Sequence, residues 1–214
     1  MHHMKITKLG HCCLLIEEAG KMILTDPGNY SDSQNDIIGI DMVVITHEHG
    51  DHLHVESLKA IMTNNPAASV VCNSMVGKIL DAQGIAHQIL EGTDAMVVKD
   101  ITLEACDGRH EEIFEEIGQV QNTGYLIAGS VYVPGDSFTA PQKPVEILAL
   151  PVAGPWCKLP DAIRFALKVA PKKAFPVHDA MLKSSGMLPL LGDLVFKKHN
   201  IELVMMAAGD SKEF

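Results

Sequence analysis

The sequence has no CxxC pair, no cluster of basic residues and no apolar run long enough to cross a membrane. Its cysteines number five, an odd set for a disulfide framework, and no basic and apolar leader precedes Met4. The longest apolar runs, such as residues 147–152, are far shorter than a membrane span. These absences predict a protein of the reducing cytoplasm without a membrane partner.

Lysine and arginine are scattered, and the formal net charge is −10, so the basic patch typical of a nucleic-acid-binding protein is missing. We expect a small-molecule substrate and no nucleic-acid partner; a homo-oligomer is compatible with the sequence. There is also no Gly-rich phosphate cradle and no GxSxG elbow. With 214 residues and 47% hydrophobic composition, the chain can bury one core, and we expect one domain over residues 1–214.

Short apolar runs alternate with amphipathic segments along the chain. Strands are expected at residues 5–9, 13–17, 22–25, 41–46, 70–72, 101–105, 124–128, 131–133, 147–150, 174–177 and 202–206. Helices are expected at residues 55–62, 75–82 (with Gly84 as C-cap), 161–169 and 187–198. The tail at residues 209–214 either frays or adds an edge strand. This order predicts mixed sheets with helices packed outside them.

Residues 46–52 read THEHGDH and directly follow an apolar strand. Neutral imidazole and carboxylate are the ligands of zinc and its borderline neighbours. His47 and His49 can turn toward one ion while Asp51 and His52 turn toward another, because Gly50 lets the chain bend tightly between them. A solvated histidine-rich turn would give a similar composition, but four ligand-type residues at the end of a buried strand favour a metal site.

Three later residues stand in the same relation to an apolar strand: His110, Asp136 and His178. Loops at one end of a sheet can converge on one site. Together with the THEHGDH segment they make seven ligand-type residues, more than the four that one tetrahedral ion uses. The sequence therefore predicts two divalent metal ions, zinc first, with manganese or iron as alternatives. His2 and His3 are left out of this argument, since they are either a tag remnant or native residues.

The order HxHxDH at residues 47–52, followed by His110, Asp136 and His178, resembles the metallo-β-lactamase superfamily over nearly the whole chain. The segments KITKLGHCCLLIEEAGKMILTDPG, VYVPGDS, ILALPVAGPW and AFPVHDA are most similar to small stand-alone hydrolases related to L-ascorbate-6-phosphate lactonase. The resemblance implies an α/β (α+β) fold, the four-layer αββα sandwich. It also implies the ligand sets: His47, His49 and His110 on one metal, Asp51, His52 and His178 on the other, and Asp136 bridging.

Such a site would cleave a small ester, lactone or phosphoester. Two metals about 3.5–4 Å apart hold a bridging hydroxide, because coordination lowers the pKa of water to about 7. Asp51 would be the catalytic residue that orients this hydroxide and later passes on its proton. The resemblance to the lactonase would suggest a sugar-phosphate substrate. The acidic residues at positions 111, 112, 115 and 116 weaken this expectation, because they would repel anionic substrates if they rim the pocket.

Five further residues have two interpretations each. His11 either contacts substrate or packs in the first turn. Asp26 either orients a liganding imidazole or only initiates a turn. Trp156 and Lys158 either wall the pocket or serve packing, and His54 is interpreted as a surface residue rather than a ligand.

Three other functions remain as alternatives. A di-iron oxidoreductase on the same fold is disfavoured because such relatives resemble an HxExDH pattern, whereas His49 stands in place of that glutamate. A catalytically silent binding protein is disfavoured by the intact ligand set. A metal-dependent nuclease is disfavoured by the acidic charge.

Overall fold

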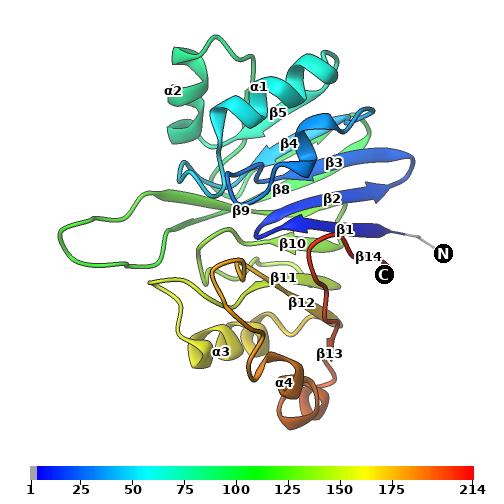
Figure 1. Cartoon of the computed structure of the whole chain (residues 1–214), viewed down its shortest axis with the longest axis vertical. Helices are drawn as coiled ribbons and strands as arrows, with labels where there is room; N and C mark the ends of the chain where they lie inside the picture. The colour runs from blue at the N-terminus through cyan, green and yellow to red at the C-terminus, as the bar shows by residue number, and fades with distance from the viewer. Residues whose placement is uncertain (1–3) are drawn as a thin grey trace.

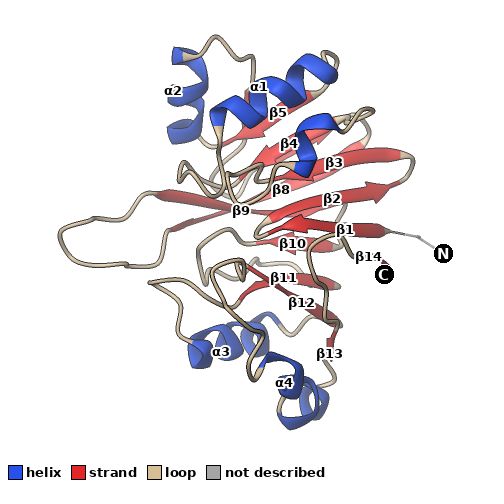
Figure 2. Cartoon of the chain, in the orientation of Figure 1, coloured by secondary structure: helices blue, strands red, loops and turns tan. Residues whose placement is uncertain are grey.

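The structure, a computed structural model, describes residues 4–214, so His2 and His3 lie outside the described residues. Two seven-stranded sheets pack face to face, and helices cover the outer side of each sheet (Figure 1). Figure 2 shows the resulting order of layers, helix, sheet, sheet, helix. The expected αββα sandwich is therefore confirmed. Within residues 4–214, no helix combines the length and apolar composition that a membrane crossing requires.

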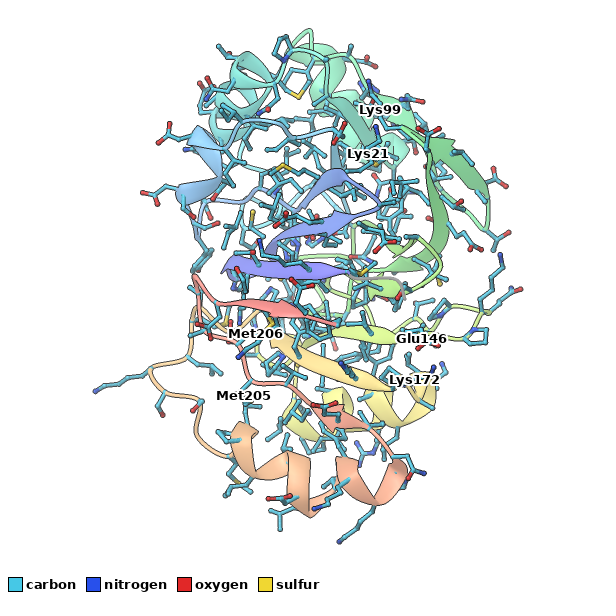
Figure 3. All side chains as sticks on the ribbon, turned by 90° about the vertical axis from the view of Figure 1, so that its right-hand side faces the viewer. Lys21, Lys99, Glu146, Lys172, Met205 and Met206 are labelled. Carbon is cyan, nitrogen blue, oxygen red and sulfur yellow. The ribbon has the colours of Figure 1, made fainter. Side chains whose placement is uncertain are left out.

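The first sheet combines an antiparallel meander with parallel strands. Its strands in spatial order are β14 (Ser211–Glu213), β1 (Lys5–Gly10), β2 (Cys13–Glu18), β3 (Lys21–Thr25), β4 (Met42–Ile45), β5 (Ser69–Cys72) and β6 (Gln88–Ile89). The strands from β3 to β6 are parallel, and α1 (Val55–Asn64) and α2 (Ser74–Ala82) form crossovers between them. A 3₁₀ turn, η1, spans Ser33–Asp36. The C-terminal tail does form an edge strand, β14 beside β1 (Figure 3).

The second sheet has the same mixed character. Its strands in spatial order are β13 (Glu202–Leu203), β12 (Lys173–Val177), β11 (Ile147–Pro151), β10 (Val131–Val133), β9 (Gln121–Ile127), β8 (Ile101–Arg109) and β7 (Ala95–Val98). The strands from β10 to β13 are parallel, and α3 (Leu159–Val169) and α4 (Leu188–Leu194) lie on the outer face. A short 3₁₀ helix, η2, follows at Phe196–His199.

Strands buried on both faces explain why the sequence shows continuous apolar runs instead of alternation. Along β11, Ile147 and Ala149 join the core between the sheets, whereas Leu148 and Leu150 pack in the core beneath α3 and α4. Successive side chains of a strand point to opposite faces, so every residue of such a strand meets an apolar layer. These central strands hold the loops at their ends in fixed positions.

Three expected elements differ clearly in extent from the structure. The helix expected at residues 187–198 is wrong in its C-terminal part, because α4 ends at Leu194 and Val195 leaves the helical conformation. This break accompanies the burial of Phe196 against the second sheet, where its side chain is fully enclosed. The strand expected at residues 202–206 shortens to β13, and β8 runs on to Arg109, so that His110 directly follows it.

A buried lysine links the first strand to the segment that carries His178. Lys8 lies on the inward face of β1, two residues from Ile6, and is 1% exposed. Its Nζ donates to both carboxylate oxygens of Asp179, at 2.8 and 2.7 Å, and to the Pro176 carbonyl at 2.9 Å. A buried ammonium needs such partners, because an unpaired charge inside a protein is strongly destabilising.

Asp179→Ala is expected to lower the free energy of unfolding by about 3 kcal/mol, since it leaves the Lys8 ammonium buried without its counter-charge. The lower end of the usual range applies because the Asp179 side chain is 26% exposed. Adding Lys8→Met should restore part of this loss by removing the charge. Urea denaturation of the single and double variants measures both effects, and additive losses would contradict the pairing.

Candidate metal centre

The ligand-type residues predicted from the sequence meet at one edge of the two sheets. Residues 46–52 follow β4 in the first sheet. In the second sheet His110 follows β8, Asp136 lies just beyond β10 and His178 follows β12. These three strands point the same way, because β8 and β10 are each antiparallel to β9, and β10, β11 and β12 are parallel. Their carboxyl ends therefore deliver side chains to a common site.

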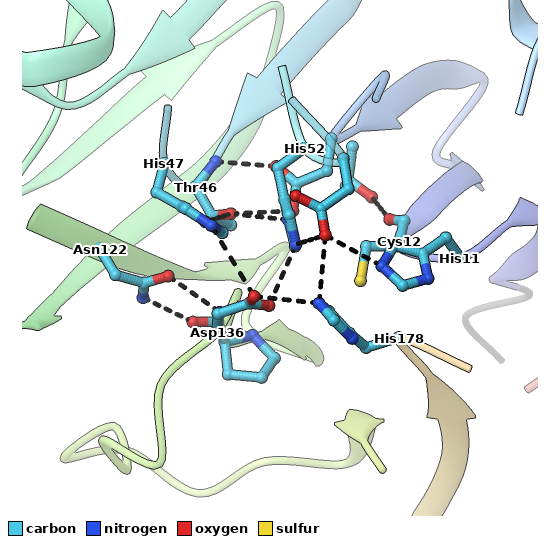
Figure 4. A network of polar contacts seen from close by, with 12 residues as sticks. His11, Cys12, Thr46, His47, His52, Asn122, Asp136 and His178 are labelled. Atoms are coloured by element: carbon cyan, nitrogen blue, oxygen red, sulfur yellow. Dashed lines mark hydrogen bonds and ion pairs between the residues drawn. The ribbon is translucent and has the colours of Figure 1, made fainter. Parts of the chain in front are cut away.

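The structure gathers these side chains into two groups that share Asp136. Within each group the potential ligand atoms lie within 4.8 Å of one another; the groups are His47, His49, His110 and Asp136, and Asp51, His52, His178 and Asp136. Figure 4 shows Asp136 at the centre of the contacts. Its carboxylate oxygens lie 3.0 Å from His52 Nε2, 3.0 Å from His178 Nε2, 3.2 Å from His110 Nε2 and 3.8 Å from His47 Nε2.

These separations fit a metal ion. Ligands at 2.0–2.1 Å from a tetrahedral ion lie about 3.3–3.4 Å apart. The Nε2 atoms of four buried histidines also lack a hydrogen-bond partner among the described residues: His47, His52, His110 and His178. Buried polar atoms without partners are rare in native proteins and call for an explanation. A set of imidazole nitrogens aimed at one carboxylate is chemically suited to hold divalent metal.

Asp26 is fully buried directly behind this cluster. Its Oδ2 accepts a hydrogen bond of 2.8 Å from His52 Nδ1 and another of 2.9 Å from the Thr46 hydroxyl. Its Oδ1 accepts the Thr46 backbone amide at 2.8 Å. With the proton of His52 held on Nδ1, the Nε2 lone pair faces the cluster. The geometry therefore supports the orienting interpretation of Asp26 over that of a simple turn.

His11 lies beneath the protein surface, behind Asp51. It is 2% exposed, and its ring stacks on Tyr30 with centroids 4.7 Å apart. Its Nδ1 accepts a 3.3 Å hydrogen bond from the Ala180 amide, which leaves Nε2–H to donate to Asp51 Oδ2 at 3.3 Å. This geometry favours a role in positioning Asp51 over direct substrate contact.

Backbone conformations at the site are unusual for residues with side chains. His11, Asp26 and His178 have φ angles of 45°, 41° and 57°, in the left-handed region that non-glycine residues seldom adopt. Gly28 is required for a different reason, because a Cβ there would collide with the backbone of Asp51. The surrounding fold thus holds the site loops in conformations that they would not adopt alone.

A cavity of about 360 Å³ opens over the cluster. Five mainly apolar side chains line it beside the ligand-type residues: Tyr30, Ile113, Pro155, Trp156 and Met181. Trp156 is 8% exposed, with ring centroids 5.3 Å from His178 and 5.7 Å from His110, so it both packs and walls the cavity.

The remaining candidates lie away from this cavity. Lys158 is exposed at the N-cap of α3 and is not among the lining residues, so its position does not support substrate contact. His54, half-buried at the start of α1, contacts Ser57 Oγ at 2.9 Å and belongs to neither ligand group. In the acidic run, Glu111 accepts a hydrogen bond from the Phe138 amide. The other three glutamates, at positions 112, 115 and 116, are exposed and do not line the cavity.

Sequence reasoning missed several residues that support the ligands. Thr46 bonds Asp26, as described, and its Oγ1 lies 3.1 Å from His47 Nδ1. Asn122, 1% exposed, accepts the Asp136 amide at 2.9 Å and donates to the Pro134 carbonyl at 2.8 Å. The available signal was a polar residue within or directly after a buried strand, which has to find a hydrogen-bond partner.

Burial and neighbouring charges shift the pKa values of the clustered histidines in different directions. Burial lowers the pKa of His47 and His49. Burial acts in the same direction on His178, but contacts with the carboxylates of Asp136 and Asp51 outweigh burial and raise the pKa of His178. At neutral pH His178 therefore keeps a proton until a metal displaces it.

An αββα sandwich with histidines and aspartates gathered at its strand ends defines a class of candidate metalloproteins. The chain matches the model of the beta-lactamase superfamily domain over residues 5–178 and belongs to this superfamily. It is 33% identical to protein Rv0786c of Mycobacterium tuberculosis, over 84% of this chain and 85% of that protein. A UPF0173 metal-dependent hydrolase of Carboxydothermus hydrogenoformans is 28% identical, with coverage of 82% and 84%.

Among solved structures, the fold is similar to that of Igni18, a metallo hydrolase from Ignicoccus hospitalis. The TM-score is 0.79 at 20% sequence identity, with 99% of this chain and 98% of that chain covered. The superfamily resemblance is thus confirmed, whereas the finer likeness to L-ascorbate-6-phosphate lactonase stays a prediction.

Asp26→Asn is expected to weaken metal binding about 10–100-fold, because an amide no longer fixes the tautomer of His52 as a carboxylate does. Asp41→Asn is a matched control, since Asp41 lies before β4, at the opposite end of that strand from the ligands, where its side chain accepts the Met22 amide and pairs with Lys21. Competition with a chromophoric chelator measures both affinities. Equal affinities in the two variants would remove Asp26 from the site.

Metal affinity is expected to rise with pH between 6 and 8, and binding is expected to release protons. The sign follows from the raised pKa of His178, whose proton must leave before Nε2 can bind metal. Calorimetric titration in two buffers of different ionisation enthalpy, at one pH, counts the released protons. Binding without proton release would show that His178 is not a ligand.

Proposed function

We propose that this protein is a metal-dependent hydrolase that holds two divalent metal ions, with zinc as the expected metal. The observation that carries the proposal is the pair of ligand groups that share the buried Asp136. The relatives named metal-dependent hydrolases support the same reaction class. The first ion would bind to His47, His49 and His110, the second to Asp51, His52 and His178, and Asp136 would bridge them.

Bound divalent metal supplies a Lewis acid and lowers the pKa of a coordinated water to about 7. The chain's own contribution centres on Asp51, whose side chain is 21% exposed and lines the cavity. Burial raises the pKa of Asp51, but contacts with His11 and then His178 outweigh it and lower this pKa. Asp51 therefore stays ionised at neutral pH, where it can accept a hydrogen bond from the attacking water and orient it.

The cavity lining favours a neutral ester or lactone over a phosphoester. Among the described residues, no lysine or arginine lines the cavity. A phosphate group would therefore find no cationic side chain there, and the exposed glutamates that follow His110 add negative potential nearby. The aromatic and aliphatic rim instead suits an apolar acyl or ring portion.

The di-iron oxidoreductase remains the alternative on the same fold. His49 argues against it, because those relatives resemble a pattern with glutamate at that position. Oxygen consumption with an electron donor, measured beside hydrolysis, decides between the two, since a hydrolase needs no redox chemistry from its metal.

Asp51→Asn is expected to lower turnover about 10²–10⁴-fold, because the amide cannot orient the attacking water as an ionised carboxylate does. The thermal midpoint should change little, since Asp51 is partly exposed. The experiment loads wild type, Asp51→Asn and the Asp41→Asn control with zinc, measures metal content, and screens lactones, carboxyl esters, thioesters and phosphodiesters.

Wild type and control should contain close to two metals per chain and hydrolyse a neutral ester or lactone best. Only trace metal in reconstituted wild type would overturn the metal centre. Full turnover by a fully loaded Asp51→Asn would remove Asp51 from the mechanism. Oxygen consumption with an electron donor, in place of hydrolysis, would favour the di-iron alternative.

A further inference from the structure

A cysteine side chain lies beside the second ligand group and has no part in the function proposed so far. Cys12 is in the turn between β1 and β2 and is 3% exposed. Its Sγ forms a third group with His11, His52 and His178, in which one ring nitrogen of each histidine and the sulfur lie within 4.8 Å of one another. Figure 4 shows the sulfur beside these three rings. His52 and His178 thus belong both to this group and to the second ligand group.

The histidines next to the thiol have buried ring nitrogens that face the metal position. Among the described residues, neither ring nitrogen of His178, which is 1% exposed, has a hydrogen-bond partner, and neither does Nε2 of the fully buried His52; the Nε2 atoms of both rings face Asp136 carboxylate oxygens at 3.0 Å. These unpaired atoms point to a ligand independently of the cysteine. Thiolate and imidazole together form a common ligand set for zinc.

The neighbouring cysteine shows that the position of Cys12 is specific. Cys12, the last residue of the turn, lies in the core between the sheets, while Cys13, the first residue of β2, lies in the core beneath α1 and α2. Cys13 belongs to none of the groups of ligand atoms in the described chain.

We propose that Cys12 supplies a thiolate ligand to the metal ion held by His52 and His178. This inference rests on the proposed function, because it requires that metal binds at the second position. On binding, the S–H bond of Cys12 breaks, its proton leaves to solvent, and a sulfur–metal bond forms without any change of oxidation state. Burial raises the pKa of this thiol, so the metal has to drive the deprotonation, as coordination does.

The two metal positions then differ in chemical character. The first, at His47, His49 and His110, offers only nitrogen and oxygen. The second adds sulfur, which favours softer ions such as zinc and cadmium over manganese or magnesium. A mixture of metals should therefore distribute unequally, with the softer ion at the position of His178.

Cobalt(II) spectroscopy of the full chain tests this assignment. Visible ligand-field bands report bound cobalt whatever its ligands, and a near-ultraviolet charge-transfer band reports a cobalt–thiolate bond. Wild type should show both. Cys12→Ser should bind cobalt but lose the charge-transfer band, while the matched control Cys13→Ser should keep it. Bound cobalt without this band in wild type, or a band that survives Cys12→Ser, would overturn the proposal.

X-ray absorption of the zinc-loaded wild type needs no variant. We expect a zinc–sulfur distance of about 2.3 Å, with one sulfur for two zinc ions. Zinc surrounded only by nitrogen and oxygen would overturn thiolate ligation and leave the hydrolase proposal intact. A wild type that binds neither cobalt nor zinc would overturn both proposals.

Discussion

The site depends on one buried carboxylate, that of Asp136, which stands between histidines from both sheets. Burial alone would raise its pKa, but His52, followed by His110 and His178, outweighs burial and lowers the pKa of Asp136 well below its usual range. An ionised carboxylate that is 2% exposed is stable only with such partners. Its charge gives the surrounding imidazoles a common centre and makes the cluster attractive to cations.

This arrangement exists only because the two sheets pack against each other. His52 comes from the first sheet, and Asp136 and His178 come from the second. The core between the sheets sets their separation, and close-packed apolar side chains resist change in that separation. The loops can then hold left-handed conformations at His11, Asp26 and His178, since the rigid strands on either side compensate the strain.

The surroundings of the cluster differ between its two sides. On the open side, Trp156, Ile113 and Met181 give the cavity an apolar rim. On the closed side, Asp26 fixes the ring of His52, and the thiol of Cys12 lies within reach of the same ring. In the proposed hydrolase, the loops on the open side would therefore contact the substrate, whereas the residues on the buried side would act on the metal.

The sequence by itself determined most helices and strands and the set of ligand-type residues, because short-range patterns carry both, whereas the four-layer order was implied by the resemblance to the superfamily. Apolar runs and helical periodicity identify most elements, and HxHxDH is contained within one loop. Only the tertiary structure decided which atoms meet. The pairing of Lys8 with Asp179, the support of Asp136 by Asn122 and the approach of Cys12 to His178 join segments distant in the chain. The break at Val195 likewise accompanies the burial of Phe196 against other elements. Such contacts depend on sheet packing and on strand direction, and no local pattern encodes these distances.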